Sequence, residues 1–255
     1  MSLTVAQWHQ RFTQQATWTR QLRSYLYTQA GIESNCRVLE VGCGTGALAA
    51  DFSDRELVTY IGLDVDFSCL FFAQRTNGNS QFLSANAYGL PFENDSFDFV
   101  ISHYLMLWLS DPMSALREMV RVVRSSGAVL ALAEPDYSSR IDEPPSLIPL
   151  GNAQTNALMQ QGANPVIGRS LPRLFNQAGL TSIRFGSPGF QSNTGRLPDG
   201  QDLEWQMLEH DLSGSLSSLE LSRYQALDRQ AWLDGSRVLW VPTFYAIGIK
   251  KPENT

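Results

Sequence analysis

Short hydrophobic runs alternate with longer amphipathic stretches through the middle of the chain. Six of these runs are apolar or β-branched and predict strands at residues 37–41, 60–64, 81–85, 97–102, 128–133 and 181–185. Strands that alternate with helical segments are typical of βα units, whose strands pair in a mostly parallel sheet. The pattern therefore predicts an α/β fold.

The clearest helical pattern lies at 111–127, "DPMSALREMVRVVRSSG", between two of these strands. Asp111 is a typical N-cap, Pro112 suits the first turn, and Gly127 is expected just beyond the last turn. The predicted apolar face of the helix consists of Met113, Leu116, Val120 and Val123.

Two further regions, residues 4–30 and 202–233, show apolar residues at helical spacing outside the alternating part. The stretches 134–150 and 185–201 are rich in Pro, Ser, Gly or Asn and are expected to be loops. We therefore predict helical caps added to a central sheet, within a single domain that spans residues 1–255.

Composition and charge narrow the range of partners. A chain of 255 residues, 43% of them hydrophobic, can bury a full α/β core. The net charge of -6 and the lack of clustered Lys or Arg argue against nucleic acid, because a phosphate backbone would be repelled. No stretch reaches the ~18 apolar residues of a membrane span, and three cysteines without metal-ligand spacing indicate a reducing compartment. We expect a cytoplasmic protein with no metal and no membrane partner.

The stretch "EVGCGTG" at 40–46 places three glycines directly after the first predicted strand. Glycine lets the backbone turn tightly and approach a ligand closely, as in sites for dinucleotides and other adenosyl compounds. The dinucleotide fingerprint G-x-G-x-x-G is not met, since Ala47 stands where its third glycine would fall. The carboxylate of Glu40 would also repel a pyrophosphate.

Asp64 ends the next predicted strand. A carboxylate at such a strand end can accept hydrogen bonds from both hydroxyls of a ribose. Together with Glu40, which would favour a positive ligand, it predicts a nucleoside cofactor that carries a sulfonium or ammonium group and no phosphate. Turn-forming glycines and strand-end acids also occur without any ligand, which is the structural alternative.

These stretches resemble the motifs of the class I S-adenosylmethionine-dependent methyltransferases. The similar motifs are "VLEVGCGTG" (38–46), "IGLDVD" (61–66), "ANAYGLPFENDSFDFVIS" (85–102) and "MVRVVRSSGAVLALAEP" (119–135). The resemblance implies a doubly wound, Rossmann-like sheet of seven strands, mostly parallel with an antiparallel last strand, for which "RVLWVPTFYAIGIK" (237–250) is suitable. The expected divisions are a helical cap at 1–32, a cofactor-binding core at 33–135 and the remaining sheet at 136–255, with a helical insertion at about 202–233.

The same resemblance implies S-adenosylmethionine as the cofactor and assigns the residues that hold it. Asp64 would bind the ribose, and Asn86 with Ala87 would meet the adenine, although many family members have Asp in place of Asn86. The methionine portion would lie against Glu40, Gly42, Cys43 and Gly44. The predicted site is completed by Gly46, Val65 and Ser102.

His103 follows the strand at 97–102 and is the candidate general base at the ligand-binding edge of the sheet. A histidine there can instead hydrogen-bond the cofactor or a neighbouring helix, so both roles stay open. The two added helical regions would close over this edge as a lid.

The function implied by the resemblance is methyl transfer from S-adenosylmethionine to a small-molecule acceptor, through an O, N or C atom. The sequence leaves three alternatives open. One is a non-catalytic protein that binds S-adenosylmethionine or S-adenosylhomocysteine, and another is an RNA or protein methyltransferase. The third is a nicotinamide-dependent oxidoreductase, which Ala47 and Glu40 disfavour.

Overall fold

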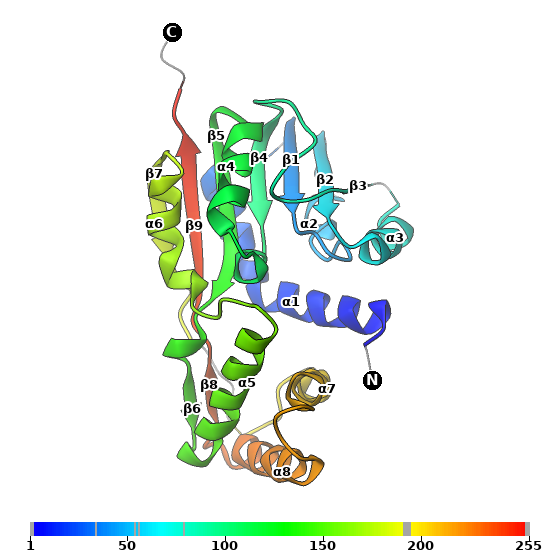
Figure 1. The fold of residues 1–255 in the computed structure, drawn as a ribbon, viewed down its shortest axis with the longest axis vertical. Helices are drawn as coiled ribbons and strands as arrows, with labels where there is room; N and C mark the ends of the chain where they lie inside the picture. The colour runs from blue at the N-terminus through cyan, green and yellow to red at the C-terminus, as the bar shows by residue number, and fades with distance from the viewer. Residues whose placement is uncertain are drawn as a thin grey trace.

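The computed structural model describes residues 3–33, 35–53, 55, 57–78, 80–190 and 195–252. A seven-stranded sheet in the order β3-β2-β1-β4-β5-β9-β7 forms its centre (Figure 1). Its strands are β1 (Cys36–Val41), β2 (Val58–Asp64), β3 (Gln81–Ser84), β4 (Phe97–Ser102), β5 (Val123–Pro135), β7 (Leu180–Gly186) and β9 (Thr243–Lys250). β9 runs antiparallel to β5 and β7, and the pairs from β3 to β5 are parallel. The predicted doubly wound sheet with an antiparallel last strand is confirmed.

Helices cover both faces of this sheet. They are α1 (Val5–Ala30), α2 (Ala50–Ser53), α3 (Phe67–Thr76), α4 (Pro112–Val122), α5 (Ile148–Gln160), α6 (Leu171–Gln177), α7 (Gln201–Leu212) and α8 (Ser218–Asp234). One face packs on α4 and α6 through buried side chains such as Met119 and Phe175. The other packs on α1 and α2 through Tyr27 and Phe52. Two short strands, β6 (Ile141–Glu143) and β8 (Val238–Trp240), form a separate sheet.

The helix predicted after β4 begins where expected but ends early. Asp111 caps α4 by accepting a hydrogen bond from the Ser114 N–H, whereas the expectation that Gly127 follows the helix end is wrong. The chain already enters β5 at Val123, which is fully buried and pairs with Phe97 of β4. Strand pairing of a β-branched residue therefore overrides the helical spacing.

The carboxyl-terminal half of α1 belongs to the core. The helical cap predicted over residues 1–32 is therefore shorter than expected. Leu26 and Tyr27 are 0% and 1% exposed and pack in the cluster that covers one face of the sheet. The amino-terminal half, residues 5–15, contains only half-buried and exposed side chains. Only this half of α1 remains a candidate lid.

The other loop and helix predictions are partly wrong. The insertion expected at 202–233 consists of two helices, α7 and α8, and Ser217 caps the second. The stretch 134–150, expected to be a loop, contains β6 and the start of α5. Within the loop expected at 185–201, residues 191–194 lie outside the described residues.

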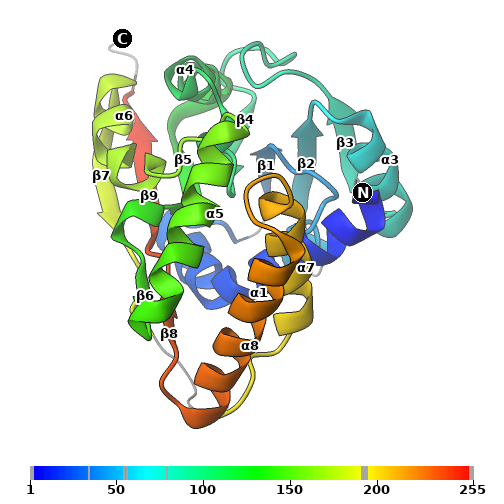
Figure 2. The same cartoon turned by 60° about the horizontal axis from the view of Figure 1, so that its bottom comes forward.

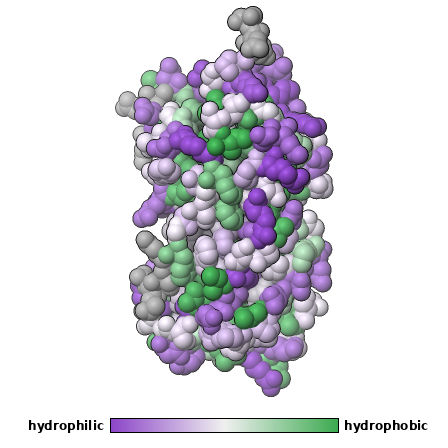
Figure 3. Space-filling model, turned by 90° about the vertical axis from the view of Figure 1, so that its left-hand side faces the viewer, coloured by the Kyte–Doolittle hydropathy of each residue, from purple (hydrophilic) through white to green (hydrophobic). Residues whose placement is uncertain are grey.

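α5, α7 and α8 form a second layer with its own hydrophobic cluster, which includes Leu150, Trp205 and Leu221. Buried Asp228 of α8 accepts hydrogen bonds from the Trp205 indole and from Arg237, which leads into β8. Figures 1 and 2 show this layer beyond the carboxyl ends of the parallel strands, with the amino-terminal half of α1 running between it and the sheet. On the side that carries α6 and β7, hydrophobic side chains are scattered among hydrophilic ones (Figure 3).

Candidate functional site

The glycine-rich turn leaves β1 in a conformation that glycine adopts most easily. Gly42, Gly44 and Gly46 have φ angles of 76°, 51° and 74°, in the left-handed region. The N–H groups of Gly42 and Cys43 both donate to the Leu63 carbonyl oxygen in β2, over 2.7 and 3.0 Å. The turn is therefore fixed to the carboxyl end of the neighbouring strand.

Asp64 joins the same turn to the end of β2. Its Oδ2 accepts from the Gly44 N–H at 2.7 Å, and its Oδ1 accepts from the Asp66 N–H at 3.0 Å. Each carboxylate oxygen has a further lone pair, so Asp64 can still accept hydrogen bonds from a ligand. The next side chain, Val65, is 72% exposed and offers an apolar surface at this strand end.

Two apolar side chains cover the turn from outside. A Cβ atom placed on Gly44 would lie 3.0 Å from the Phe12 ring of α1, and one on Gly42 would lie 2.6 Å from Cδ1 of Leu105. Any larger residue at these two positions would therefore collide with the cover as well as strain the backbone. The amino-terminal half of α1 lies directly on the predicted cofactor turn.

Glu40 lies inside the core. Its side chain is 2% exposed, and its Oε2 accepts from the Tyr60 hydroxyl at 2.5 Å. Burial raises the pKa of Glu40 to about 8, while the bond from Tyr60 opposes the shift. Glu40 is therefore largely neutral at pH 7, which weakens the expectation that its charge attracts a positive cofactor.

This raised pKa predicts a dependence of stability on pH. Below pH 4.5, the usual pKa of a glutamate, Glu40 is protonated in both the folded and the unfolded protein. Its contribution to the free energy of unfolding is fully present there and is lost as pH rises toward about 8. Glu40→Gln stays neutral, so the wild-type advantage over this variant should shrink from pH 5 to pH 8. Urea unfolding at several pH values measures this, with exposed Glu33→Gln as the control. A difference that stays constant with pH would contradict the prediction.

The remaining predicted cofactor residues lie at the ends of β3 and β4. Asn86 is exposed and its Oδ1 accepts from the Tyr88 N–H at 3.0 Å, while Ala87 is half-buried. Ser102 is fully buried, and its Oγ has no hydrogen-bond partner among the described residues. Since buried polar atoms almost always have partners, this unmatched hydroxyl is unusual for a packed core.

His103 is tied to α1. Its Nε2 lies 2.8 Å from the Thr19 hydroxyl, and its ring packs edge-on against Tyr104 at 4.6 Å. Burial and the nearby Arg23 guanidinium lower the pKa of His103 to about 3. The ring is neutral at physiological pH and only a weak base, and its catalytic role stays a prediction.

Glu134 is a site residue that the sequence analysis missed. It is the next-to-last residue of β5, is fully buried, and accepts from the N–H groups of Leu105, Met106 and Leu107 at 2.8–3.2 Å. Burial raises its pKa to about 8, and the three N–H groups oppose the shift. The signal in the sequence was a single glutamate within the otherwise apolar "AVLALAEP". Glu134 holds the segment that places Leu105 over the turn.

A polar cluster lies between α1, α7 and the ends of β4 and β5. Arg11 of α1 pairs with Glu204 of α7 and is only 12% exposed. Tyr104 and Tyr137 follow β4 and β5. Burial raises the pKa of both hydroxyls, and the positive charge of Arg11 opposes that rise. The cluster therefore combines hydroxyl and charged groups at the sheet edge where an acceptor would bind beside the turn.

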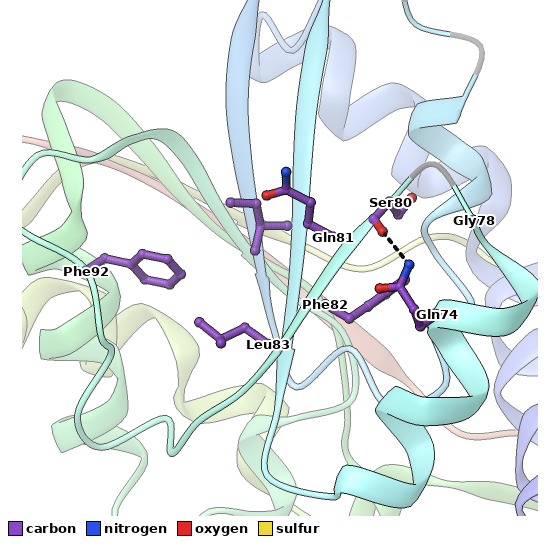
Figure 4. A pocket seen from close by; sticks show the side chains of 8 residues that line it. Gln74, Gly78, Ser80, Gln81, Phe82, Leu83 and Phe92 are labelled. Atoms are coloured by element: carbon purple, nitrogen blue, oxygen red, sulfur yellow. Dashed lines mark hydrogen bonds between the residues drawn. The ribbon is translucent and has the colours of Figure 1, made fainter.

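A surface pocket of about 510 Å³ lies elsewhere, along the edge strand β3 (Figure 4). Gln74, Ser80 and Leu83 are among its lining residues, and the Gln74 amide donates to the Ser80 carbonyl oxygen at 3.4 Å. The pocket contains none of the residues predicted to hold the cofactor. Phe12 and Leu105 cover the predicted site at Gly44 and Gly42.

Among the residues that the structure describes, no group of three or more His, Cys, Asp and Glu side chains is placed to hold a metal ion. None of the described helices is both long and apolar enough to cross a bilayer.

Cys43 is buried, and burial raises the pKa of its thiol well above the usual range, so the turn does not carry a reactive thiolate.

Comparison with known proteins identifies the domain. Residues 39–131 match the family model described as a methyltransferase domain. The chain is 29% identical over 160 residues to a demethylmenaquinone methyltransferase of Renibacterium salmoninarum. This match covers 63% of this chain and 60% of that protein. It is 32% identical over 155 residues to the O-methyltransferase rstn1 of Aspergillus nomiae. This second match covers 58% of this chain and 66% of that protein. The matches thus span less than two thirds of either relative.

A solved structure supports the same fold. Phosphoethanolamine N-methyltransferase 2 of Haemonchus contortus, in complex with S-adenosyl-L-methionine, superposes with a TM-score of 0.58. The match has 14% sequence identity and covers 92% of this chain and 53% of that chain, so it shows the fold alone. Together with the strand order, these findings support a class I S-adenosylmethionine-dependent methyltransferase domain over the matched residues 39–131.

Proposed function

We propose that this chain binds S-adenosylmethionine at the turn after β1 and transfers its methyl group to a small-molecule acceptor. The observation that carries the proposal is the turn itself, whose glycines have positive φ angles and whose Gly44 N–H is held by Asp64. The unpartnered Ser102 hydroxyl adds a buried polar atom nearby at the end of β4. Glycine backbone, a strand-end carboxylate and an unmatched hydroxyl suit an adenosyl ligand.

Each predicted residue has a distinct task in this proposal. Asp64 would accept the ribose hydroxyls, Asn86 and Ala87 would meet the adenine, and Val65 would cover its apolar face. The glycine turn would hold the methionine portion. The cofactor supplies a methyl group already activated by a sulfonium, so the chain has to align the acceptor and exclude water.

A small acceptor is supported by how the site is covered. The ion pair of Arg11 with Glu204 joins α1 to α7 near Tyr104 and Tyr137. Such a closed arrangement leaves less room for a folded RNA or protein than for a small molecule. The names of the two curated relatives, a demethylmenaquinone methyltransferase and an O-methyltransferase, point the same way.

A cytoplasmic location is also proposed, since all three cysteines are buried and free.

The lid makes a prediction about hydrogen exchange. Residues 5–15 of α1 and helices α7 and α8 lie outside the two clusters that pack on the sheet, so they should exchange faster than β1 and β4 in the free protein. S-adenosylhomocysteine should slow exchange in 5–15, because His9 bonds Thr45 of the turn at 2.9 Å. The second half of α1, residues 16–27, has one face packed in the core and serves as the internal control. Equal protection of both halves would contradict a mobile lid.

Transfer of a labelled methyl group tests the proposed reaction. The protein is incubated with methyl-tritiated S-adenosylmethionine and, separately, with the low-molecular-weight, RNA and protein fractions of a cell extract. Label that appears in the low-molecular-weight fraction supports the proposal. Label in RNA or protein would favour the macromolecular alternative, and cofactor binding without transfer to any fraction would favour a non-catalytic binding protein.

A further inference from the structure

A chain of hydrogen bonds connects His103 to the interior of α1. The Thr19 hydroxyl lies 2.8 Å from His103 Nε2, and Nη1 of Arg23 donates to the same hydroxyl oxygen at 2.6 Å. Arg23 is 2% exposed and is held by Asp51, whose two oxygens accept from Nε at 2.7 Å and Nη2 at 3.1 Å. One hydroxyl therefore links the histidine to a buried, paired cation.

The single hydroxyl proton of Thr19 can be donated to only one acceptor at a time. The carbonyl oxygens of Gln15 and Ala16 lie 3.2 and 3.4 Å from Oγ1, farther away than His103 Nε2. Donation from the Arg23 guanidinium polarises the hydroxyl and makes its O–H a stronger donor. The same positive charge disfavours a proton on Nε2. Distance and charge both direct the Thr19 proton to Nε2.

We infer that the Thr19–Arg23 contact holds His103 in the neutral tautomer that carries its proton on Nδ1, so that the ring donates a hydrogen bond to a bound ligand. This inference rests on the proposed function for the identity of the ligand. It replaces the general-base role predicted from the sequence, because the Nε2 lone pair is engaged and Nδ1 already holds a proton. Thr19 and Arg23 are positioning residues, since they act through the ring.

The surroundings of the ring agree with a neutral donor. Arg23 is the charged group that acts on the ring, and burial together with its charge lowers the pKa of His103 to about 3. Tyr104, which packs against the ring, has a pKa raised to about 12 by burial and is neutral as well. No described residue hydrogen-bonds Nδ1, and this nitrogen is not sealed inside the protein. Its N–H is therefore available to a ligand.

A donor at this place limits the acceptors that suit the site. The ring can bind an acceptor oxygen through that oxygen's lone pair, but it cannot remove a proton from a hydroxyl group. The favoured acceptors are those whose reacting atom is already unprotonated at neutral pH, such as an acidic phenol or enol that ionises in water. An aliphatic alcohol would need a base from elsewhere.

Long-range proton–nitrogen NMR of the imidazole rings tests the tautomer directly. The chain has three histidines, and His103→Gln identifies the relevant signal. We expect the Nδ1–H tautomer in the free wild-type protein from pH 5 to pH 8. Thr19→Val should convert the ring partly or fully to the Nε2–H form, and Thr19→Ser should restore the wild-type pattern. Thr17→Val is the matched control, because Thr17 is exposed on the same helix.

Several results would overturn the inference. They are an Nε2–H tautomer in the wild type, a ring that becomes protonated between pH 5 and pH 7, and an unchanged tautomer in folded Thr19→Val. The wild-type spectrum decides the tautomer even if the variant fails to fold. Because the spectra are recorded without cofactor, failure of S-adenosylmethionine binding would refute the proposed function and leave this result standing.

Discussion

Replacing Glu134 with alanine is expected to destabilise the fold by at least about 3 kcal/mol. The fully buried carboxyl group accepts hydrogen bonds from the N–H groups of Leu105, Met106 and Leu107. Alanine leaves all three donors without a partner, and each buried unpaired donor costs about 1–3 kcal/mol. Urea unfolding at pH 7, followed by tryptophan fluorescence, measures the loss.

Glu118 provides a matched control for this variant. It accepts a single backbone N–H, from Leu90 at 2.8 Å, and its side chain also pairs with Arg121 at a more exposed place. Glu118→Ala should therefore cost only about 1 kcal/mol. Glu134→Gln should fall between the two, because an amide keeps one acceptor oxygen but turns an N–H₂ group toward the backbone donors. A loss for Glu134→Ala no larger than for Glu118→Ala would contradict the account.

Replacing Asp64 with alanine is expected to weaken S-adenosylmethionine binding by about 1.5–3 kcal/mol, which is roughly 10- to 150-fold in dissociation constant. The carboxylate is the proposed acceptor for the ribose hydroxyls, and it also holds the Gly44 N–H at 2.7 Å. Alanine would remove the ligand contact and loosen the turn that carries the methionine portion. Isothermal titration of the wild type and the variant measures the change.

Asp98 is the control carboxylate for this experiment. It lies near the amino end of β4, away from the glycine turn, and its Oδ2 accepts from the backbone N–H of Arg37 at 2.7 Å. Asp98→Ala should therefore lower stability without changing the cofactor dissociation constant. If Asp64→Ala binds the cofactor as tightly as Asp98→Ala, then Asp64 is not the ribose ligand.

Most strands of the central sheet were predictable because each is a short apolar run bounded by turn residues. β6 was missed inside an expected loop, and the last strand expected at 237–250 divides into β8 and β9. β4 was predicted with its observed bounds, Phe97–Ser102, and the strands beside it differ by a few residues. The end of α4 was not predictable from spacing, because the choice of helix or strand at Val123 depends on its pairing with Phe97. α5 was missed because its run of small and amide side chains shows no clear apolar stripe.

The candidate site was predictable where one local stretch carries the chemistry. The glycine turn and Asp64 could each be read from a short stretch at a strand end, and the structure brings these two stretches into contact through the Gly44 N–H. Glu134 was missed because its partners lie 27–29 residues earlier in the chain. The contact of His103 with Thr19 spans 84 residues and depends on how α1 packs on the sheet. Hydrogen bonds of this kind follow from tertiary packing and leave no local pattern.

Calorimetric titration with S-adenosylmethionine, S-adenosylhomocysteine and a nicotinamide dinucleotide tests the central claim most directly. The turn of Gly42 and Gly44 and the strand-end carboxylate of Asp64 predict that both adenosyl compounds bind with micromolar dissociation constants, on the order of -8 kcal/mol. The dinucleotide should give no binding heat, since Ala47 breaks its fingerprint. Binding of the dinucleotide without binding of either adenosyl compound would contradict the account.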